Sequence, residues 1–462
     1  MSKYQAYPKY KDSGVEWLKE IPKDWSVVPL KYIAELTPKK SELEESIMSD
    51  KCTFLPMEKL KLNSITLDET RTVKDVYDGY TYFRNGDVLI AKVTPCFENK
   101  NMAIAADLTN GIGFGSSEIY VLRPNDSINN RFLYYRLQED NFMAVATGAM
   151  TGAGGLKRVP SETVNNFTIA IPTTNEQNQI AAFLDHETAK IDTLIGKQQQ
   201  LIELLKEKRQ AVISHAVTKG LNPQAPMKDS GVEWLGEVPE HWDLTPLKYL
   251  CNFKGGGTPT KDNLNYWTNG TIPWVSPKDM KSFWINKTQD YVTELAVKES
   301  STNIIFEGSL MMVVRSGILQ RTIPIAINTV PVTMNQDMKA LLFNNKMLTE
   351  YAAYFIIGNI PQLLLEWSKE GATVESIEHE YLANSYFPVP PKEEQEKIIC
   401  TIMSQLELFD NLETQAQQAI KLMQERRTAL ISAAVTGKID VRNWIAPTTS
   451  SDTNEVQQEA TA

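Results

Sequence analysis

Apolar residues recur every three to four positions over two long stretches of the chain. In residues 174–217, seven of the ten positions at this spacing are apolar: Ile180, Leu184, Glu187, Ile191, Leu194, Gln198, Leu201, Leu205, Lys208 and Val212. In the second stretch eight of ten are apolar: Ile398, Ile402, Gln405, Phe409, Leu412, Ala416, Ala419, Met423, Arg426 and Leu430. This period predicts two helices, each with one apolar stripe.

Both predicted helices are unusually long and begin with recognisable signals. Thr174 and Gln177 fit a capping box at the start of the first helix, and Pro391 suits the first turn of the second. Each helix would be about 43 residues and roughly 65 Å long at ~1.5 Å per residue. A helix of that length with one apolar stripe needs a partner, so we expect the two to pair as a coiled coil.

The polar residues within each stripe bear on the direction of pairing. Antiparallel packing would bring Glu187 close to Arg426, whereas parallel packing would set Lys208 beside Arg426. Because like charges at a seam are unfavourable, the pattern favours antiparallel helices. An alternative is that these polar side chains simply point into solvent.

Residues 10–170 and 227–388 carry mixed patterns. Short β-rich segments that end in turn signals cover residues 84–93, 115–124, 307–316 and 323–332, and helical patterns cover 129–138 and 348–360. We therefore predict the α+β class for both regions.

The chain also repeats itself. Residues 10–33 and 227–250 are identical at 15 of 24 positions with an offset of 217, and residues 171–220 match 389–438 with an offset of 218. Two long halves with repeated ends predict an approximate internal twofold, and duplex DNA is a substrate with that symmetry. The repeat is also cyclic, so the end of the second helix near Thr436 should approach the start of the first half near Lys11.

The predicted architecture is two pseudo-symmetric α+β domains separated by two long antiparallel helices. The expected segments are a first domain at 1–170, a first helix at 171–222, a second domain at 223–388, a second helix at 389–440 and a flexible tail at 441–462. Four tryptophans recur in the repeated segments: Trp17, Trp25, Trp234 and Trp242. We interpret them as core anchors rather than DNA-stacking side chains, because their presence in both halves suits architecture.

Composition limits the possible functions. The 462 residues carry a formal net charge of −10, and none of the five segments is net basic. A DNA-binding role would therefore require positive charge gathered on one face, or supplied by a partner. No apolar run approaches the ~18 residues of a membrane span, and no signal peptide is recognisable. We interpret the cysteines as reduced thiols, so we expect a cytoplasmic location. The four cysteines lie far apart without a CxxC pair, so disulfides and zinc are not expected.

No catalytic motif is recognisable. An amino-methyltransferase would need an Asn/Asp-Pro-Pro-aromatic loop, which the sequence lacks. The glycines of residues 111–115 could form a cofactor loop, but they precede a strand, so we favour a turn. The segment 255–261, GGGTPTK, either cradles a phosphate through its backbone N–H groups or forms a surface turn. The four histidines form no metal-binding pair. We therefore expect no catalytic residue and no metal site.

Several segments resemble the specificity subunits of type I restriction–modification enzymes. They are DSGVEWLGEVPEHW at 229–242, GGTPTKDNLNYWTNGTIPW at 256–274, GDVLIAK at 86–92, IPTTNEQNQIAAFLD at 171–185 and RQAVISHAVTKGL at 209–221. The resemblance covers nearly the whole chain. In the first half, LTPKKSELEES at 36–46 replaces the glycine loop, so no role of Gly255–Thr260 is transferred to that half.

The resemblance implies a non-catalytic subunit in which each domain reads half of a split DNA site and the helices set the gap. It implies double-stranded DNA, two modification subunits and restriction subunits as partners, no membrane, and a prokaryotic cytoplasm as the location. S-adenosylmethionine, ATP and Mg would then be bound by the partners and no cofactor by this chain. Two alternatives remain: an assembly scaffold with two protein-binding domains, and a fused methyltransferase remnant, against which the missing loop argues.

Candidate DNA-binding residues are basic or loop residues near the ends of expected strands or in the glycine turn. They are Lys92, Lys100, Lys157 and Arg158 in the first half, and Lys254, Thr258, Lys278, Lys281, Arg315 and Arg321 in the second. For each of them, an ordinary solvated side chain is the competing interpretation. The sequence does not identify the recognised bases, because readout depends on which side chains reach a groove.

Overall fold

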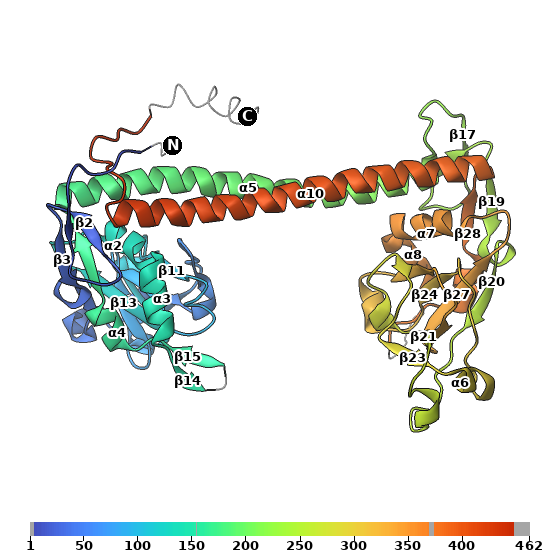
Figure 1. The fold of residues 1–462 in the computed structure, drawn as a ribbon, viewed down its shortest axis with the longest axis horizontal. Helices are drawn as coiled ribbons and strands as arrows, with labels where there is room; N and C mark the ends of the chain where they lie inside the picture. The colour runs from blue at the N-terminus through green and yellow to red at the C-terminus, as the bar shows by residue number, and fades with distance from the viewer. Residues whose placement is uncertain (1–3, 154, 369–373, 448–462) are drawn as a thin grey trace. The chain divides into compact units, whose positions relative to one another are not determined.

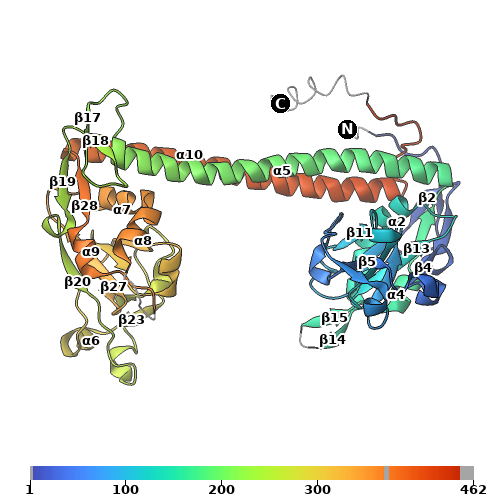
Figure 2. The ribbon, with the colours of Figure 1, turned by 180° about the vertical axis from the view of Figure 1, so that it is seen from behind.

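The computed structural model describes residues 4–153, 155–368 and 374–447 (Figures 1 and 2). The chain divides into two compact units, Met1–Gln198 with Gln418–Ala462, and Gln199–Gln417. The division passes through both long helices, α5 (Thr174–Lys219) and α10 (Lys392–Val435). We call residues 10–171 the first domain and residues 227–389 the second domain.

The first domain contains two four-stranded sheets and several strand pairs. One sheet has the order β11–β10–β13–β4: β11 (Met102–Ile104), β10 (Val88–Ala91), β13 (Ile119–Pro124) and β4 (Ala34–Leu36). The other has the order β8–β5–β12–β9: β8 (Thr70–Thr72), β5 (Lys51–Leu55), β12 (Ile112–Gly115) and β9 (Thr81–Arg84). The pairs are β1 (Tyr10–Asp12) with β2 (Glu20–Pro22), β3 (Ser26–Pro29) with β16 (Thr168–Ile171), β6 (Leu60–Lys61) with β7 (Ser64–Ile65), and β14 (Thr151–Ala153) with β15 (Leu156–Arg158). The helices are α1 (Val73–Val76), α2 (Asn130–Leu137), α3 (Asp140–Gly148) and α4 (Ser161–Asn166).

The second domain repeats this plan. Its larger sheet has the order β20–β27–β24–β25–β22: β20 (Cys251–Gly255), β27 (Met338–Phe343), β24 (Leu310–Val313), β25 (Ile325–Asn328) and β22 (Trp284–Ile285). The smaller sheet is β23–β21–β26: β23 (Asp290–Val292), β21 (Ile272–Val275) and β26 (Thr333–Met334). The pairs are β17 (Met227–Asp229) with β18 (Glu237–Pro239), and β19 (Asp243–Pro246) with β28 (Tyr386–Val389). The helices are α6 (Glu294–Glu299), α7 (Thr349–Gly358), α8 (Ile360–Trp367) and α9 (His379–Asn384).

The two domains share a core topology, although β9 of the first domain and β22 of the second have no counterpart. The order β4–β13–β10–β11 corresponds to β20–β27–β24–β25, with antiparallel pairs throughout. In the smaller sheets, β5 runs parallel to β12 and antiparallel to β8, as β21 does to β26 and β23. The predicted α+β class and the internal repeat are therefore confirmed, and the expected strands and helices around β10, β13, β24, β25, α2 and α7 are present.

Each domain core includes the start of one long helix and the end of the other. The first core contains Phe183 of α5 and Ile431 of α10, and the second contains Ile402 of α10 and Ile213 of α5. Side chains at opposite ends of two helices can share a core only if the helices run antiparallel, and both views show the pair alongside each other (Figures 1 and 2).

Two ion pairs between the helices confirm the antiparallel direction. In the first unit, Nε of Arg427 lies 3.0 Å from Oδ1 of Asp192. In the second unit, Arg209 is paired with Asp410. The repeat offset of 218 relates Asp192 to Asp410 and Arg209 to Arg427, so the same interaction occurs once in each unit. Glu187 instead accepts a hydrogen bond from the hydroxyl of Tyr4.

The chain ends meet as the cyclic repeat predicts. The hydroxyl of Tyr10 donates to the carbonyl oxygen of Gly437 at 3.0 Å, and the backbone N–H of Asp440 donates to the oxygen of Gln5 at 2.7 Å. Trp444 packs against the ring of Phe183 with centroids 5.4 Å apart. Residues 441–447, which the sequence suggests are part of a flexible tail, are thus partly packed on α5; the rest of that expected tail lies outside the described residues.

The tryptophans of the repeat are core anchors, as expected. Trp25 and Trp242 are buried in equivalent positions of the two cores. The indole N–H of Trp17 donates to the oxygen of Thr168, and that of Trp234 donates to Glu366. These side chains therefore fasten each repeated segment to its own domain.

Two local predictions are wrong. The capping box at Thr174 does not form, because the side-chain oxygen of Gln177 accepts from the N–H of Asn129 instead, and Thr173 rather than Thr174 accepts from the N–H of Glu176. The glycine segment at 111–115 is not a turn throughout, since residues 112–115 form β12. A Cβ at Gly113 would lie 2.3 Å from the ring of Phe83, so this glycine makes room for a packed aromatic side chain.

The predicted apolar seam is buried only in part. Its outer positions, such as Ile180 and Ile398, are fully buried in the domain cores. Its middle positions Leu194, Leu201 and Leu412 remain 43%, 40% and 36% exposed. Within the described ranges, no helix is both long and apolar enough to cross a membrane.

Candidate nucleic-acid interface

In the first domain the structure brings three of the candidate residues together at the end of β10. Val93 forms an antiparallel bridge with Arg158, and the N–H of Thr94 donates to the oxygen of Lys157 at 3.0 Å. The N–H of Lys157 in turn donates to Oγ1 of Thr94, and the oxygen of Lys92 accepts from Val159. The β14–β15 hairpin therefore places Lys157 and Arg158 beside Lys92.

A carboxylate that sequence reasoning missed organises this cluster. Nε and Nη2 of Arg158 donate to the two carboxylate oxygens of Glu118 at 3.0 and 2.8 Å. The Lys92 ammonium lies 5.3 Å from the centroid of the Tyr120 ring. The hydrogen bond from Arg158, with a further contribution from Lys92, lowers the pKa of Glu118. Arg158 and Lys92 act on one carboxylate, and Lys157 is exposed on the same hairpin. The three cations exceed this one acid, which leaves a net positive patch that suits phosphate.

Lys100 lies apart from this cluster. Its ammonium donates to the oxygen of Gln138 at 2.8 Å and pairs with Asp140 at 3.3 Å. These contacts tie the loop after β10 to the turn between α2 and α3. Lys100 is thus better placed to support the loop than to contact a ligand.

The equivalent place in the second domain is the end of β24. Arg315 forms an antiparallel bridge with Ser376, just as Val93 does with Arg158. Arg315 and Arg321 are both exposed, and both belong to the connection from β24 to β25. Lys254 is exposed on β20 and faces Ala340 in the sheet.

The glycine loop of the second domain does not form a phosphate cradle. The N–H of Gly256 donates to the oxygen of Met338 at 3.3 Å, and that of Gly257 to the oxygen of Met334 at 2.8 Å. A Cβ at Gly256 would lie 1.8 Å from the oxygen of Asn335, so glycine is required by close backbone packing. Thr258 donates to Gln336 through its hydroxyl. The turn interpretation of this segment therefore holds.

Lys278 and Lys281 lie elsewhere, in the loop after β21. Both are exposed, and the loop is held by Ser276, whose N–H and hydroxyl donate to Asp279 at 2.9 and 2.8 Å. No hydrogen bond or ion pair among the described residues joins these lysines to the end of β24.

A lysine–histidine pair in the second domain was also not predicted from the sequence. Nζ of Lys339 lies 2.9 Å from Nδ1 of His379 and 5.8 Å from the centroid of Phe253. Burial lowers the pKa of Lys339, and burial together with Lys339 lowers the pKa of His379. The strand pairing of Lys339 with Gly255 places Lys339 beside the glycine loop, but this pairing is visible only in the fold, so the sequence offered no signal for it.

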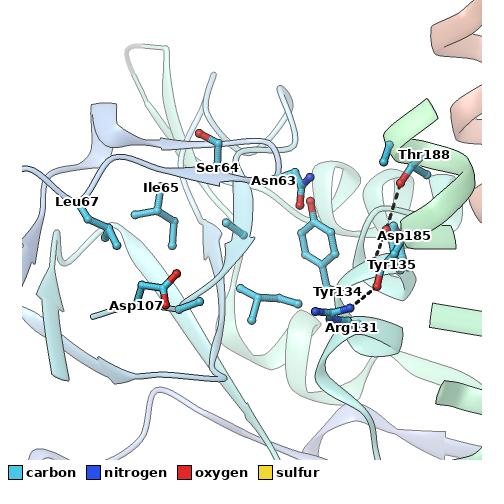
Figure 3. A pocket seen from close by; sticks show the side chains of 14 residues that line it. Asn63, Ser64, Ile65, Leu67, Asp107, Arg131, Tyr134, Tyr135, Asp185 and Thr188 are labelled. Carbon is cyan, nitrogen blue, oxygen red and sulfur yellow. Dashed lines mark hydrogen bonds and ion pairs between the residues drawn. The ribbon is translucent and has the colours of Figure 1, made fainter. Parts of the chain in front are cut away.

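The first unit contains a cavity of about 570 Å³ (Figure 3). It lies between the β6–β7 hairpin and α2 with α5, and Asn63, Tyr134 and Asp185 are among its lining residues. The carboxylate of Asp185 accepts from the hydroxyl of Tyr135 at 2.9 Å and pairs with Arg131, so this carboxylate already has partners within the protein. Across residues 4–153, 155–368 and 374–447, no group of His, Cys, Asp and Glu could hold a metal ion.

The family comparison matches the repeat seen in the fold. The model of the "Type I restriction modification DNA specificity domain" family matches residues 22–204 and again residues 239–422. The chain belongs to this family. The resemblance proposed from the sequence is thus confirmed.

Relatives agree with this assignment. The chain is 38% identical over 189 residues to the EcoR124I/EcoR124II specificity subunit of Escherichia coli, and the match covers 40% of this chain and 42% of that protein. It is 37% identical over 196 residues to the EcoAI specificity subunit of Escherichia coli, covering 40% and 33%. These matches span less than half of either relative. A putative MjaX specificity subunit of Methanocaldococcus jannaschii is 22% identical over 437 residues, covering 92% of this chain and 95% of that one.

Solved structures share the fold. A chain from a structure on complex assembly and conformational transition of the type I R-M system has a TM-score of 0.73 at 16% identity, covering 91% of this chain and 99% of that one. The HsdS subunit from Thermoanaerobacter tengcongensis has a TM-score of 0.56 at 16% identity, covering 91% and 98%. At this identity the likeness supports the fold alone.

Proposed function

We propose that this protein is the non-catalytic DNA-specificity subunit of a type I restriction–modification complex. Each domain reads one half of a bipartite site in double-stranded DNA, and the paired helices set the spacer between the halves. The observation that carries the proposal is the repetition of one core domain topology on antiparallel helices. Duplex DNA has a matching twofold in its backbone, so two equivalent readers suit two half-sites.

The DNA-facing surface of each domain is proposed at the end of its central strand. In the first domain, Lys92, Lys157 and Arg158 gather there, and in the second, Arg315 and Arg321 share one exposed connection. Arginine can bind guanine through two parallel hydrogen bonds, whereas lysine suits phosphate as a point charge. Lys254 and Thr258 lie on or beside β20, and Lys278 and Lys281 stay candidates for DNA contact on their own exposed loop. Lys100 supports the loop after β10 instead.

The helices are proposed to dock two copies of one partner, the modification subunit. Leu204 and Leu422 are 60% and 61% exposed, and the repeat offset of 218 relates them. Leu194 and Leu412 are related in the same way and are also exposed. Each unit thus carries at least one exposed leucine on each helix, and exposed apolar groups in a recurring arrangement are typical of a protein interface.

Catalysis is assigned to partners. Modification subunits would bind S-adenosylmethionine, and restriction subunits would use ATP and Mg; this chain would bind none of them. The full complex would act in the cytoplasm, where its DNA substrate lies. Since the chain is net acidic, DNA affinity should depend strongly on the partner subunits.

The proposal is tested by electrophoretic shift and methylation mapping with the purified complex. We expect weak, salt-sensitive DNA binding by the chain alone, tight binding with modification subunits, and methylation at one bipartite sequence. A complex that assembles but methylates without sequence preference would support a structural scaffold instead. Methyl transfer or cleavage by the highly purified single chain would contradict the non-catalytic role.

A further inference from the structure

One buried glutamine occupies the same position in both units and makes the same three hydrogen bonds. Gln177 is the fourth residue of α5 and is 1% exposed, and Gln395 is the fourth residue of α10 and is 0% exposed. The offset of 218 relates the two. Buried primary amides need partners for both N–H groups and the oxygen.

In the first unit, Gln177 joins three separate pieces of chain. Its Nε2 donates to the oxygen of Ser127 at 3.1 Å and to that of Pro172 at 3.0 Å. Its Oε1 accepts from the N–H of Asn129 at 2.8 Å. Asn129 is the N-cap of α2, so this one side chain links the starts of α5 and α2 with the segment that leads out of β16.

Gln395 repeats this arrangement in the second unit. Its Nε2 donates to the oxygens of Lys346 and Pro390 at 2.8 and 2.9 Å. Its Oε1 accepts from the N–H of Leu348 at 2.8 Å, and Leu348 is the N-cap of α7. Among the polar contacts seen in the described parts of both units, this set of three recurs atom for atom.

These two amides lie where each domain joins its long helix. Only two residues separate the last strand of each domain from its long helix: residues 172–173 after β16 and residues 390–391 after β28. A two-residue connection holds the distance between strand and helix but leaves their angle to be fixed by other contacts. Each glutamine supplies such a contact, because it ties the helix start to a domain segment about 48 residues earlier in sequence.

We propose that Gln177 and Gln395 are positioning residues that fix the angle at which each domain is held on its long helix. This inference rests on the proposed function, because that angle then determines which spacer lengths allow both domains to meet their half-sites. The glutamines touch neither DNA nor partner in this proposal. They act on spacer selectivity, whereas the half-site sequences are read by other residues.

The test uses the assembled complex and a library of DNA duplexes. The library holds the two half-sites mapped for the parent protein and varies the spacer by one base pair at a time. The variants are Gln177→Met and Gln395→Met, which keep the side-chain length but remove all three hydrogen bonds, and Gln177→Asn and Gln395→Asn, which keep the amide but shorten its reach. Gln424→Met, at an exposed position of α10, is the matched control.

The measured quantity is the ratio of methylation at the parental spacer to methylation at spacers one base pair longer or shorter. We expect this ratio to fall about tenfold in the Met variants, which corresponds to the free energy of one buried hydrogen bond. The half-site sequences should not change, and the control should keep the parental ratio. A merely structural role would lower methylation equally at all spacers and leave the ratio unchanged, which would overturn the inference. Failure of both the Met and Asn variants to assemble would also overturn it, since a positioning residue is not required for folding.

The outcome separates this inference from the proposed function. If the parent complex methylates no bipartite site, the proposed function fails. If the parent complex methylates one site and the variants keep its spacer selectivity, only the positioning role fails.

Discussion

The two domains agree in their scaffold and differ at the surface proposed to meet DNA. Strand order, the helix-to-helix ion pair and the buried glutamine recur in both. At the end of the central strand, however, the first domain has Val93 bridged to Arg158, which Glu118 holds, whereas the second has Arg315 at the place of Val93, bridged to Ser376. The difference indicates that the repeat preserves how each domain is held and leaves the reading surface free to vary.

A second difference lies where the chain ends cover α5. Tyr4 and Trp444 pack on Phe183 in the first unit. The equivalent residue of α10, at the offset of 218, is Thr401, which is exposed. The helix thus carries an aromatic side chain where the chain ends cover it and a polar one where they do not, so departures from the repeat follow local burial.

The largest expected effect concerns the glycine loop that only the second domain has. Gly256→Ala should destabilise the protein by about 3 kcal/mol or more, because the added Cβ would meet backbone atoms of Asn335 that cannot move aside. Urea denaturation measures the change. Gly255→Ala is the control, since a Cβ there meets no atom within 4 Å; equal destabilisation by both would contradict the close packing of this loop.

The ion pair shared by the two units should differ in strength. Arg427→Ala should cost about 1–3 kcal/mol, because Nη1 of Arg427 also donates to the buried Oε1 of Gln138 at 3.2 Å and its loss leaves that oxygen unpaired. Arg209→Ala should cost only about 0–1 kcal/mol, since its partner Asp410 is 65% exposed. Free energies of unfolding of the two variants test the difference, and equal values would show that burial does not separate the two pairs.

A smaller effect is expected from arginine substitutions at the proposed DNA-facing surfaces of the two domains. Arg158→Ala should weaken methylation through the first half-site and Arg315→Ala through the second, each by about 1–2 kcal/mol in DNA affinity if the arginine contacts a base. Competition with duplexes altered in one half-site shows which half is affected. Uniform weakening across all sequences would assign these arginines to phosphate, and no change would remove them from the interface.

Periodicity alone predicted much of the architecture. The long helices and the strands around β10 and β24 follow from local patterns. The antiparallel direction of the helices follows from the argument that parallel packing would set Lys208 beside Arg426. The capping box was wrong because Gln177 finds partners about 50 residues away, which no local pattern reveals. The partly exposed seam has a related cause, since the domain cores fully bury the helix ends, whereas towards the middle buried positions such as Leu205 and Ala416 alternate with exposed ones such as Leu201.

The candidate site was less predictable. Choosing basic residues near strand ends found Lys92, Lys157 and Arg158, which the fold gathers. It missed Glu118 and the Lys339–His379 pair, because the partners lie 40 residues apart in sequence and meet only in the folded domain. The glycine loop was ambiguous because sequence cannot show whether a backbone N–H is already bonded within the fold.

The most direct test of the account is to shorten both helices and map the methylated sequence. Deleting one heptad from each, residues 195–201 and 413–419, keeps the repeat in register and shortens each helix by ~10.5 Å at ~1.5 Å per residue. Duplex DNA rises ~3.4 Å per base pair, so the account predicts the same two half-sites with a spacer up to about three base pairs shorter. An assembled, active complex that methylates the original site with an unchanged spacer would contradict the claim that the helices set the distance between two equivalent readers.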